Sequence, residues 1–94
     1  MNAGVTRMVT MGVDAARSRV AVALARGHSE VWAGVGHHPT EESPPDIDLL
    51  RRIADDPRVV AVGEIGLDFE EKGAPERHVQ VARLHELCNL AVDL

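Results

Sequence analysis

VVAVGEIGLD, residues 59–68, is the stretch that decides the fold class of this chain. An apolar run of valine and alanine leads into a carboxylate, Glu64, which stands between Gly63 and Ile65. A continuous apolar run is typical of a strand that is covered on both faces, as in parallel sheets. Functional groups of α/β proteins lie at the carboxyl ends of such strands. Glu64 is therefore a candidate functional residue at the end of a buried strand.

Two similar units precede this strand, and a helix follows it. The earlier strands are predicted at residues 5–11 and 31–35. Helices are predicted after Asp14, after Asp46 and from about Pro75, because aspartate is a favoured helix N-cap and proline a favoured first-turn residue. Strands that alternate with helices predict parallel pairing with right-handed crossovers.

The repeated strand-helix unit indicates an α/β fold that is part of something larger. A closed (β/α)8 barrel takes roughly 250 residues, so 94 residues make about three eighths of one. Three parallel strands also leave two open edges, which invite pairing with another strand. We expect one domain, residues 1–94, made of three consecutive βα units of a partial (β/α)8 TIM barrel.

Composition sets limits on the class of protein. The chain is 45% hydrophobic with a formal net charge of -5, and it has no run of five basic residues, which disfavours a general nucleic-acid-binding patch. Cys88 is the only cysteine, which excludes an internal disulfide and suits a reducing cytosol. The N-terminus lacks the apolar region of a signal peptide, and no apolar stretch reaches the roughly 20 residues of a membrane span. We expect a soluble, cytoplasmic protein without membrane contact.

Glu64 needs a partner if it ends a buried strand. Strict alternation along the strand would place Val60, Val62 and Glu64 on one side and Val59 on the other. An unpaired buried carboxylate is costly, and a divalent cation is a simple partner because such ions prefer carboxylate oxygens. An arginine partner or a role as a helix cap is the alternative, and the residues alone leave both open.

Two motifs, GHHP at residues 36–39 and GEIGLD at residues 63–68, resemble those of the TatD family of metal-dependent hydrolases. The resemblance extends from about residue 4 to residue 94. It implies a (β/α)8 barrel of the metal-dependent hydrolase type and a deoxyribonuclease-like activity on phosphodiester bonds, with DNA or another phosphoester as substrate. The chain would correspond to about strands 2–4 of that barrel, without the first strand and the C-terminal half.

The resemblance also implies roles for individual residues. Glu64 matches a glutamate that joins a binuclear divalent metal site, occupied by Mg²⁺, Mn²⁺ or Zn²⁺. His38 matches the histidine before the proline of the G-x-H-P loop and is expected to contact substrate, for instance a phosphate. Asp68 ends GEIGLD and is a second substrate-side candidate, with a packing or capping role equally open. His37 stands where the family usually has an apolar residue and is expected to be incidental, and no catalytic residue is identified.

His85 and Cys88 are a weaker candidate pair. They lie three residues apart on the last predicted helix, a spacing that would allow both to bind one metal ion. Cys88, however, shares an expected apolar face with Val81, Leu84 and Ala91. We therefore expect this pair to serve packing.

The ligand count leaves two functions open. The family carries an H-x-H metal pair on its first strand, and no H-x-H occurs in this sequence. The chain thus offers one of several ligands and is not expected to form the complete site alone. It is interpreted as a truncated, inactive piece of a hydrolase in which metal-activated water attacks a phosphodiester. The alternative is a non-catalytic α/β module that associates with itself or with a partner through its open strand edges.

Overall fold

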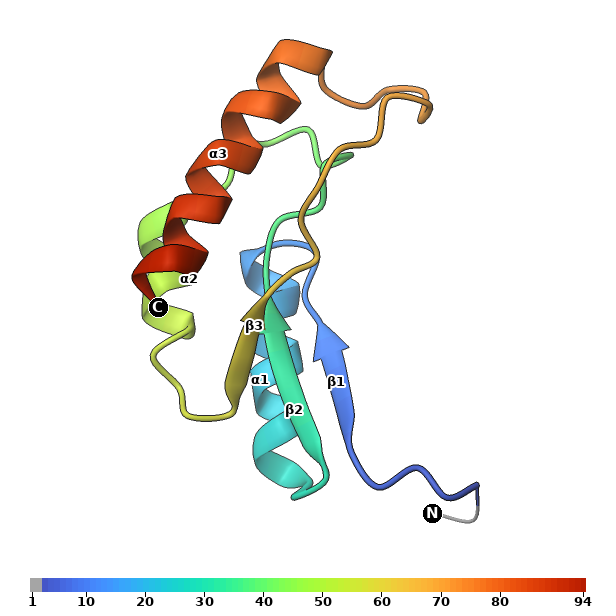
Figure 1. Cartoon of the computed structure of the whole chain (residues 1–94), viewed down its shortest axis with the longest axis vertical. Coiled ribbons are helices and arrows are strands. Elements are labelled where there is room, and N and C mark those ends of the chain that lie inside the picture. Colours follow the sequence, from blue (N-terminus) through green and yellow to red (C-terminus); the bar gives the residue numbers. More distant parts are fainter. Residues whose placement is uncertain (1–2) are drawn as a thin grey trace.

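The computed structural model describes residues 3–94 and shows one parallel sheet with three helices (Figure 1). The strands are β1 (Met8–Met11), β2 (Val31–Val35) and β3 (Val59–Val62), in the sheet order β1-β2-β3. The helices are α1 (Ala15–Gly27), α2 (Ile47–Ile53) and α3 (Arg77–Asp93). Both strand pairs are parallel. The predicted α/β class, with three βα units of a partial TIM barrel, is confirmed.

The aspartates predicted to cap helices do so. The Asp14 carboxylate accepts a hydrogen bond of 2.7 Å from the backbone N–H of Arg17. The Asp46 carboxylate accepts one of 3.1 Å from the N–H of Leu49. Each cap satisfies a first-turn N–H group that has no partner within the helix. The loops that leave β1 and β2 therefore end at these two aspartates, where α1 and α2 begin.

The core lies between the sheet and its helices. Alternate residues of β2 face the helices and are buried, while α1 lies behind the sheet (Figure 1). The core consists of Ala21, Val22, Ala25, Val31, Ala33, Val35, Leu50, Leu87 and Leu90. On the opposite face, where the register aligns Val9 with Trp32, Val9 stays 49% exposed. The molecule thus has one covered and one open sheet face.

The strict alternation predicted for the third strand is wrong. The register between β2 and β3 shifts at Ala33/Gly34, so Val60 has no partner in β2. Val59 and Val62 both pack against the core, whereas Val60 is 55% exposed. An extra residue in one strand reverses the side of the sheet on which the following side chains lie. The shift comes before Glu64 and therefore changes the side expected for the residues between them.

The buried face of α3 also differs from the prediction. The buried residues are Gln80, Leu87 and Leu90, whereas Cys88 and Ala91 of the expected apolar face are exposed. On this face the Gln80 amide hydrogen-bonds to the backbone of Asp68 in the loop after β3, a contact that the sequence pattern does not reveal. Within residues 3–94, no helix is long and apolar enough to cross a membrane.

Candidate functional site

The loops that leave the three strands are tied together at the carboxyl edge of the sheet. The backbone N–H of Glu64 donates to the carbonyl of Gly12, after β1, at 3.0 Å. The N–H of His38, after β2, donates to the carbonyl of Val13 at 2.8 Å. The two motif residues are therefore hydrogen-bonded to the same short segment after β1, and that segment belongs to neither motif.

Gly36 allows this close approach. A Cβ atom at Gly36 would lie 2.5 Å from the carbonyl carbon of Gly63 and 2.7 Å from the backbone nitrogen of Glu64. Both contacts are with backbone atoms, which cannot move aside as a side chain could. Any larger residue at position 36 would push the end of β3 away from β2. The first glycine of GHHP thus serves the geometry of the second motif.

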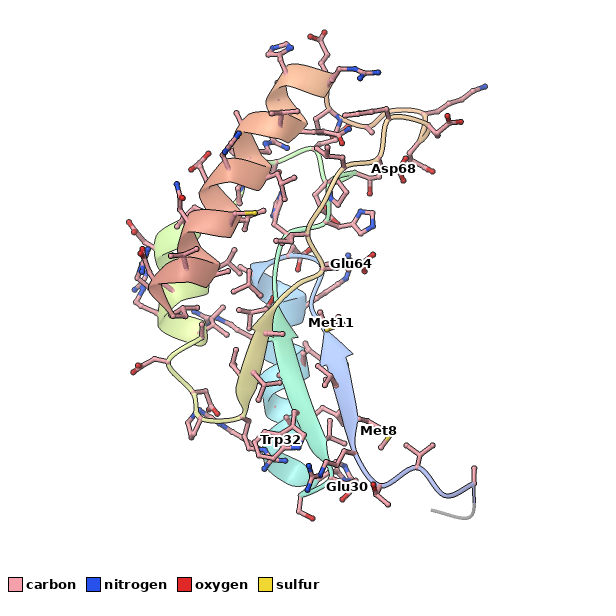
Figure 2. The ribbon with its side chains drawn as sticks, viewed as in Figure 1. Met8, Met11, Glu30, Trp32, Glu64 and Asp68 are labelled. Atoms are coloured by element: carbon pink, nitrogen blue, oxygen red, sulfur yellow. The ribbon has the colours of Figure 1, made fainter. Side chains whose placement is uncertain are left out.

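His38 and Glu64 meet side chain to side chain. Nε2 of His38 lies 3.2 Å from Oε1 of Glu64. The His38 side chain is 25% exposed and that of Glu64 52% exposed, so both are open to a ligand. Figure 2 shows Glu64 just beyond the strand ends, above Met11. The structure brings together the two residues that the sequence singled out most strongly, and within residues 3–94 the Glu64 carboxylate forms its salt-bridge contact with this histidine and not with an arginine.

Thr40 is a contact of this pair that the sequence analysis missed. Its hydroxyl Oγ1 lies 2.7 Å from Nδ1 of His38, and its backbone N–H donates to the same nitrogen at 3.2 Å. The signal that could have found it is local. A threonine two residues after a histidine, across a proline, can reach back to the ring in a turn.

His37 holds its own loop. The side chain is buried, and its Nε2–H donates to the carbonyl of Ser43 at 2.7 Å. Burial lowers the pKa of His37 below its ordinary value of 6.5, with the hydrogen bond to Ser43 acting in the opposite direction. The Arg83 guanidinium of α3 donates to the carbonyls of Glu41 and Glu42 at 3.0 Å each. His37 is thus a structural anchor of the loop from Gly36 to Asp46.

Asp68 is engaged in its own loop. Its carboxylate accepts hydrogen bonds from the backbone N–H groups of Glu70 and Glu71, at 3.1 and 3.2 Å. Its backbone is held by Gln80, whose amide accepts from the Asp68 N–H and donates to the Asp68 carbonyl, both at 2.8 Å. Figure 2 shows Asp68 farther along the loop than Glu64. These contacts are those of a turn cap.

Gln80 is the second residue that sequence reasoning missed. It stands four and seven residues before Leu84 and Leu87, a spacing that puts it on the same helix face. A polar residue in such a stripe is a sign of a buried hydrogen-bonding group. Its amide also donates to the carbonyl of Pro75 at 2.8 Å.

The potential metal ligands of the described residues are dispersed. Among residues 3–94, no three or more histidine, cysteine, aspartate or glutamate side chains lie together as a metal-binding group. His85 and Cys88 are both exposed on α3, so the packing role expected for them is wrong. At the strand ends the structure brings together one carboxylate and one imidazole, those of Glu64 and His38.

Comparison with known proteins places this sequence in a family. The family model described as TatD related DNase matches residues 1–94. The chain is 42% identical over 82 residues to a protein of Erwinia amylovora named 3'-5' ssDNA/RNA exonuclease TatD, covering 82% of this chain and 32% of the relative. Proteins of the same name from Erwinia billingiae and Salmonella typhimurium are 36% and 35% identical, over 99% and 85% of this chain and 37% and 35% of the relatives.

The match is thus extensive for this chain and partial for its relatives. It spans about a third of the length of these curated relatives. The family model covers all 94 residues, including both the GHHP and the GEIGLD motifs. The chain belongs to the TatD-related DNase family.

Proposed function

We propose that this chain forms the Glu64 side of the active site of a metal-dependent nuclease, which hydrolyses phosphodiester bonds. The observation that carries the proposal is the pairing of Glu64 with His38 at 3.2 Å at the carboxyl ends of parallel strands. Membership of a DNase family, with relatives named as ssDNA/RNA exonucleases, supports nucleic acid as the substrate class.

Glu64 fits one position of a metal site. Its carboxylate is half exposed at the end of β3, and carboxylate oxygen is the donor that Mg²⁺ and Mn²⁺ prefer and that Zn²⁺ also accepts. Such an ion, when bound, supplies an activated water and offsets the charge of the phosphate. Nε2 of His38 faces the carboxylate at 3.2 Å, and a phosphate oxygen bound beside Glu64 would share this ring nitrogen's N–H. Asp68 caps a turn in the loop that follows. This is the packing or capping role that the sequence analysis left open beside substrate contact.

The chain alone is proposed to bind metal weakly and to be inactive. A binuclear site requires several ligands, and the described residues gather one carboxylate beside one histidine. The match to about a third of each relative supports the interpretation of residues 1–94 as a partial domain, about strands 2–4 of a barrel. The exposed, unpaired thiol of Cys88 supports a cytoplasmic location.

A second candidate function is self-association. The open sheet face and the edge strands expose Val9, Met11 and Val60, and uncovered strand edges favour pairing with another chain. The occupant we propose is a second copy of this chain. The test of this candidate concerns the whole molecule and is argued in the Discussion.

The metal assignment is tested with Mn²⁺ and the full chain. Paramagnetic Mn²⁺ broadens the NMR signals of nearby nuclei, so it locates even a weak site. We expect broadening of the signals of residues around Glu64 and His38. Glu64→Ala should abolish this local broadening and leave the amide spectrum of the rest of the sheet unchanged. Glu86→Ala, which removes an exposed glutamate of α3, is the matched control.

Two outcomes would overturn parts of the proposal. Broadening spread over the acidic surface, or unchanged in Glu64→Ala, would remove Glu64 as a metal ligand. Hydrolysis of a single-stranded oligonucleotide by the isolated chain, lost in Glu64→Ala, would retain the metal site and overturn the proposed inactivity.

A further inference from the structure

Thr40 makes two contacts with one nitrogen of His38. The hydroxyl Oγ1 lies 2.7 Å from Nδ1, and the backbone N–H donates to Nδ1 at 3.2 Å. The segment is held in a turn in which the N–H of Glu41 donates to the carbonyl of His38 at 3.1 Å. Pro39 lies between the two residues and fixes its own φ. Thr40 is therefore held beside the ring by backbone geometry.

These contacts determine where the imidazole carries its proton. A backbone N–H can only donate, so Nδ1 of His38 must be the acceptor. The Thr40 hydroxyl can rotate to donate to the same nitrogen. In a neutral imidazole whose Nδ1 accepts, the proton is on Nε2. Nε2 is the atom that faces Oε1 of Glu64 at 3.2 Å, and a carboxylate oxygen can act only as an acceptor toward it.

We infer that Thr40 is a positioning residue, which fixes His38 as an Nε2–H donor toward Glu64. Residues that orient a metal-binding side chain contribute measurably to metal affinity. Nδ1 is occupied by Thr40 and Nε2 carries the proton, so His38 acts as a donor to anionic oxygens and not as a ligand to the metal. The expected effect of Thr40 on metal binding rests on the proposed function. The expected position of the proton on His38 rests on geometry alone.

The test uses the full chain labelled with ¹⁵N-histidine, in mildly alkaline solution where imidazoles are neutral. The ¹⁵N chemical shifts of a ring report which nitrogen carries the proton. We expect a protonated Nε2 and an unprotonated Nδ1 for His38. Thr40→Val keeps the shape and the backbone N–H donor but removes the hydroxyl, so the Nδ1–H tautomer should gain population beside the parent form, and Thr40→Ser should restore the parent pattern.

Metal binding is measured on the same samples with Mn²⁺. Loss of one hydrogen bond in Thr40→Val is expected to weaken the binding at Glu64 about 2- to 10-fold, and Thr40→Ser should stay near the parent value. A protonated Nδ1 in the unsubstituted chain overturns the inference without any variant. The inference is also overturned if the folded Thr40→Val variant shows the same share of the two His38 tautomers as the parent chain.

The two proposals fail in different ways. If Mn²⁺ does not bind at Glu64 while the His38 tautomer responds to Thr40→Val, the metal proposal fails and the positioning of His38 by Thr40 stands. If Mn²⁺ binds at Glu64 with the same affinity in the parent chain, Thr40→Val and Thr40→Ser, the positioning role is overturned and the metal proposal stands.

Discussion

Gln80 shows at the scale of one residue how α3 is tied to the loop after β3. Its buried amide makes three hydrogen bonds of 2.8 Å, two with the backbone of Asp68 and one with the carbonyl of Pro75. Gln80→Leu keeps the volume and removes all three. Because backbone groups would then lack partners, we expect the free energy of unfolding in urea to fall by about 2–3 kcal/mol.

The control for this prediction is a surface position on the same helix. Asn89→Leu makes a similar polar-to-apolar change at an exposed site of α3 and should change the free energy of unfolding by less than about 0.5 kcal/mol. Equal effects of the two substitutions would mean that the Gln80 hydrogen bonds add nothing to stability.

The residues that sequence reasoning found differ in kind from those that it missed. Glu64 could be predicted because it ends a parallel strand, where functional groups of α/β proteins lie, and His38 because GHHP resembles the G-x-H-P loop of the TatD family. Thr40 and Gln80 act through hydrogen bonds whose partners are fixed only by the three-dimensional course of the loops. The ring orientation of His38 therefore lay beyond what spacing along the chain reveals.

The loop between β2 and α2 is an element whose stability should depend on pH through His37. The imidazole is buried and donates to the carbonyl of Ser43, and burial lowers its pKa below 6.5. The unfolded chain then binds a proton below pH 6.5 while the folded chain does not. Stability is full above this pH and is lost as the pH falls toward the lower folded pKa.

His37→Gln tests this dependence, because a glutamine can donate to Ser43 but does not titrate. The free energy of unfolding of the parent chain should fall below pH 6.5 with a slope of up to about 1.4 kcal/mol per pH unit, and this part of the slope should vanish in the variant. Urea denaturation at a series of pH values measures both. His85→Gln, at an exposed position, is the control, and an unchanged slope in His37→Gln would contradict the prediction.

Elements were predicted well where local signals decide them. β2 has the expected bounds, and Asp14 and Asp46 cap the expected helices, because caps and apolar runs are properties of neighbouring residues. The first strand is shorter than expected, beginning at Met8. The turn of α3 and the register shift before Val60 depend on partners from other elements, and periodicity alone could not supply them.

At the scale of the whole molecule, the two faces of the sheet have opposite character. The helices cover one face, and the other keeps the large apolar side chains of Val9 and Met11 in contact with solvent at 49% and 42% exposure, while Val60, at the register shift of β3, is 55% exposed. Trp32, on the same open face, is covered by the Arg58 guanidinium, which lies 3.9 Å from the ring centroid. The exposed part therefore follows the two edge strands, β1 and β3.

Charge on these edges should control the association of the chain with itself. Apolar side chains and unpaired backbone groups on an edge strand favour pairing, and a lysine there disfavours it. If a second copy covers this face, the mass of the parent chain measured by light scattering should rise with concentration toward that of a dimer. The double substitution Val9→Lys and Val60→Lys should keep the mass at that of one chain, because two lysines would have to be desolvated.

Val92→Lys is the matched control for this prediction, since Val92 is 84% exposed and belongs to α3 and not to an edge strand. It should associate as the parent chain does. A parent chain that stays monomeric at every concentration would contradict self-association, and so would a concentration dependence that the two edge lysines leave unchanged. Association sensitive to the edge lysines, with Mn²⁺ still bound at Glu64, would instead show that the open edges act independently of the metal site.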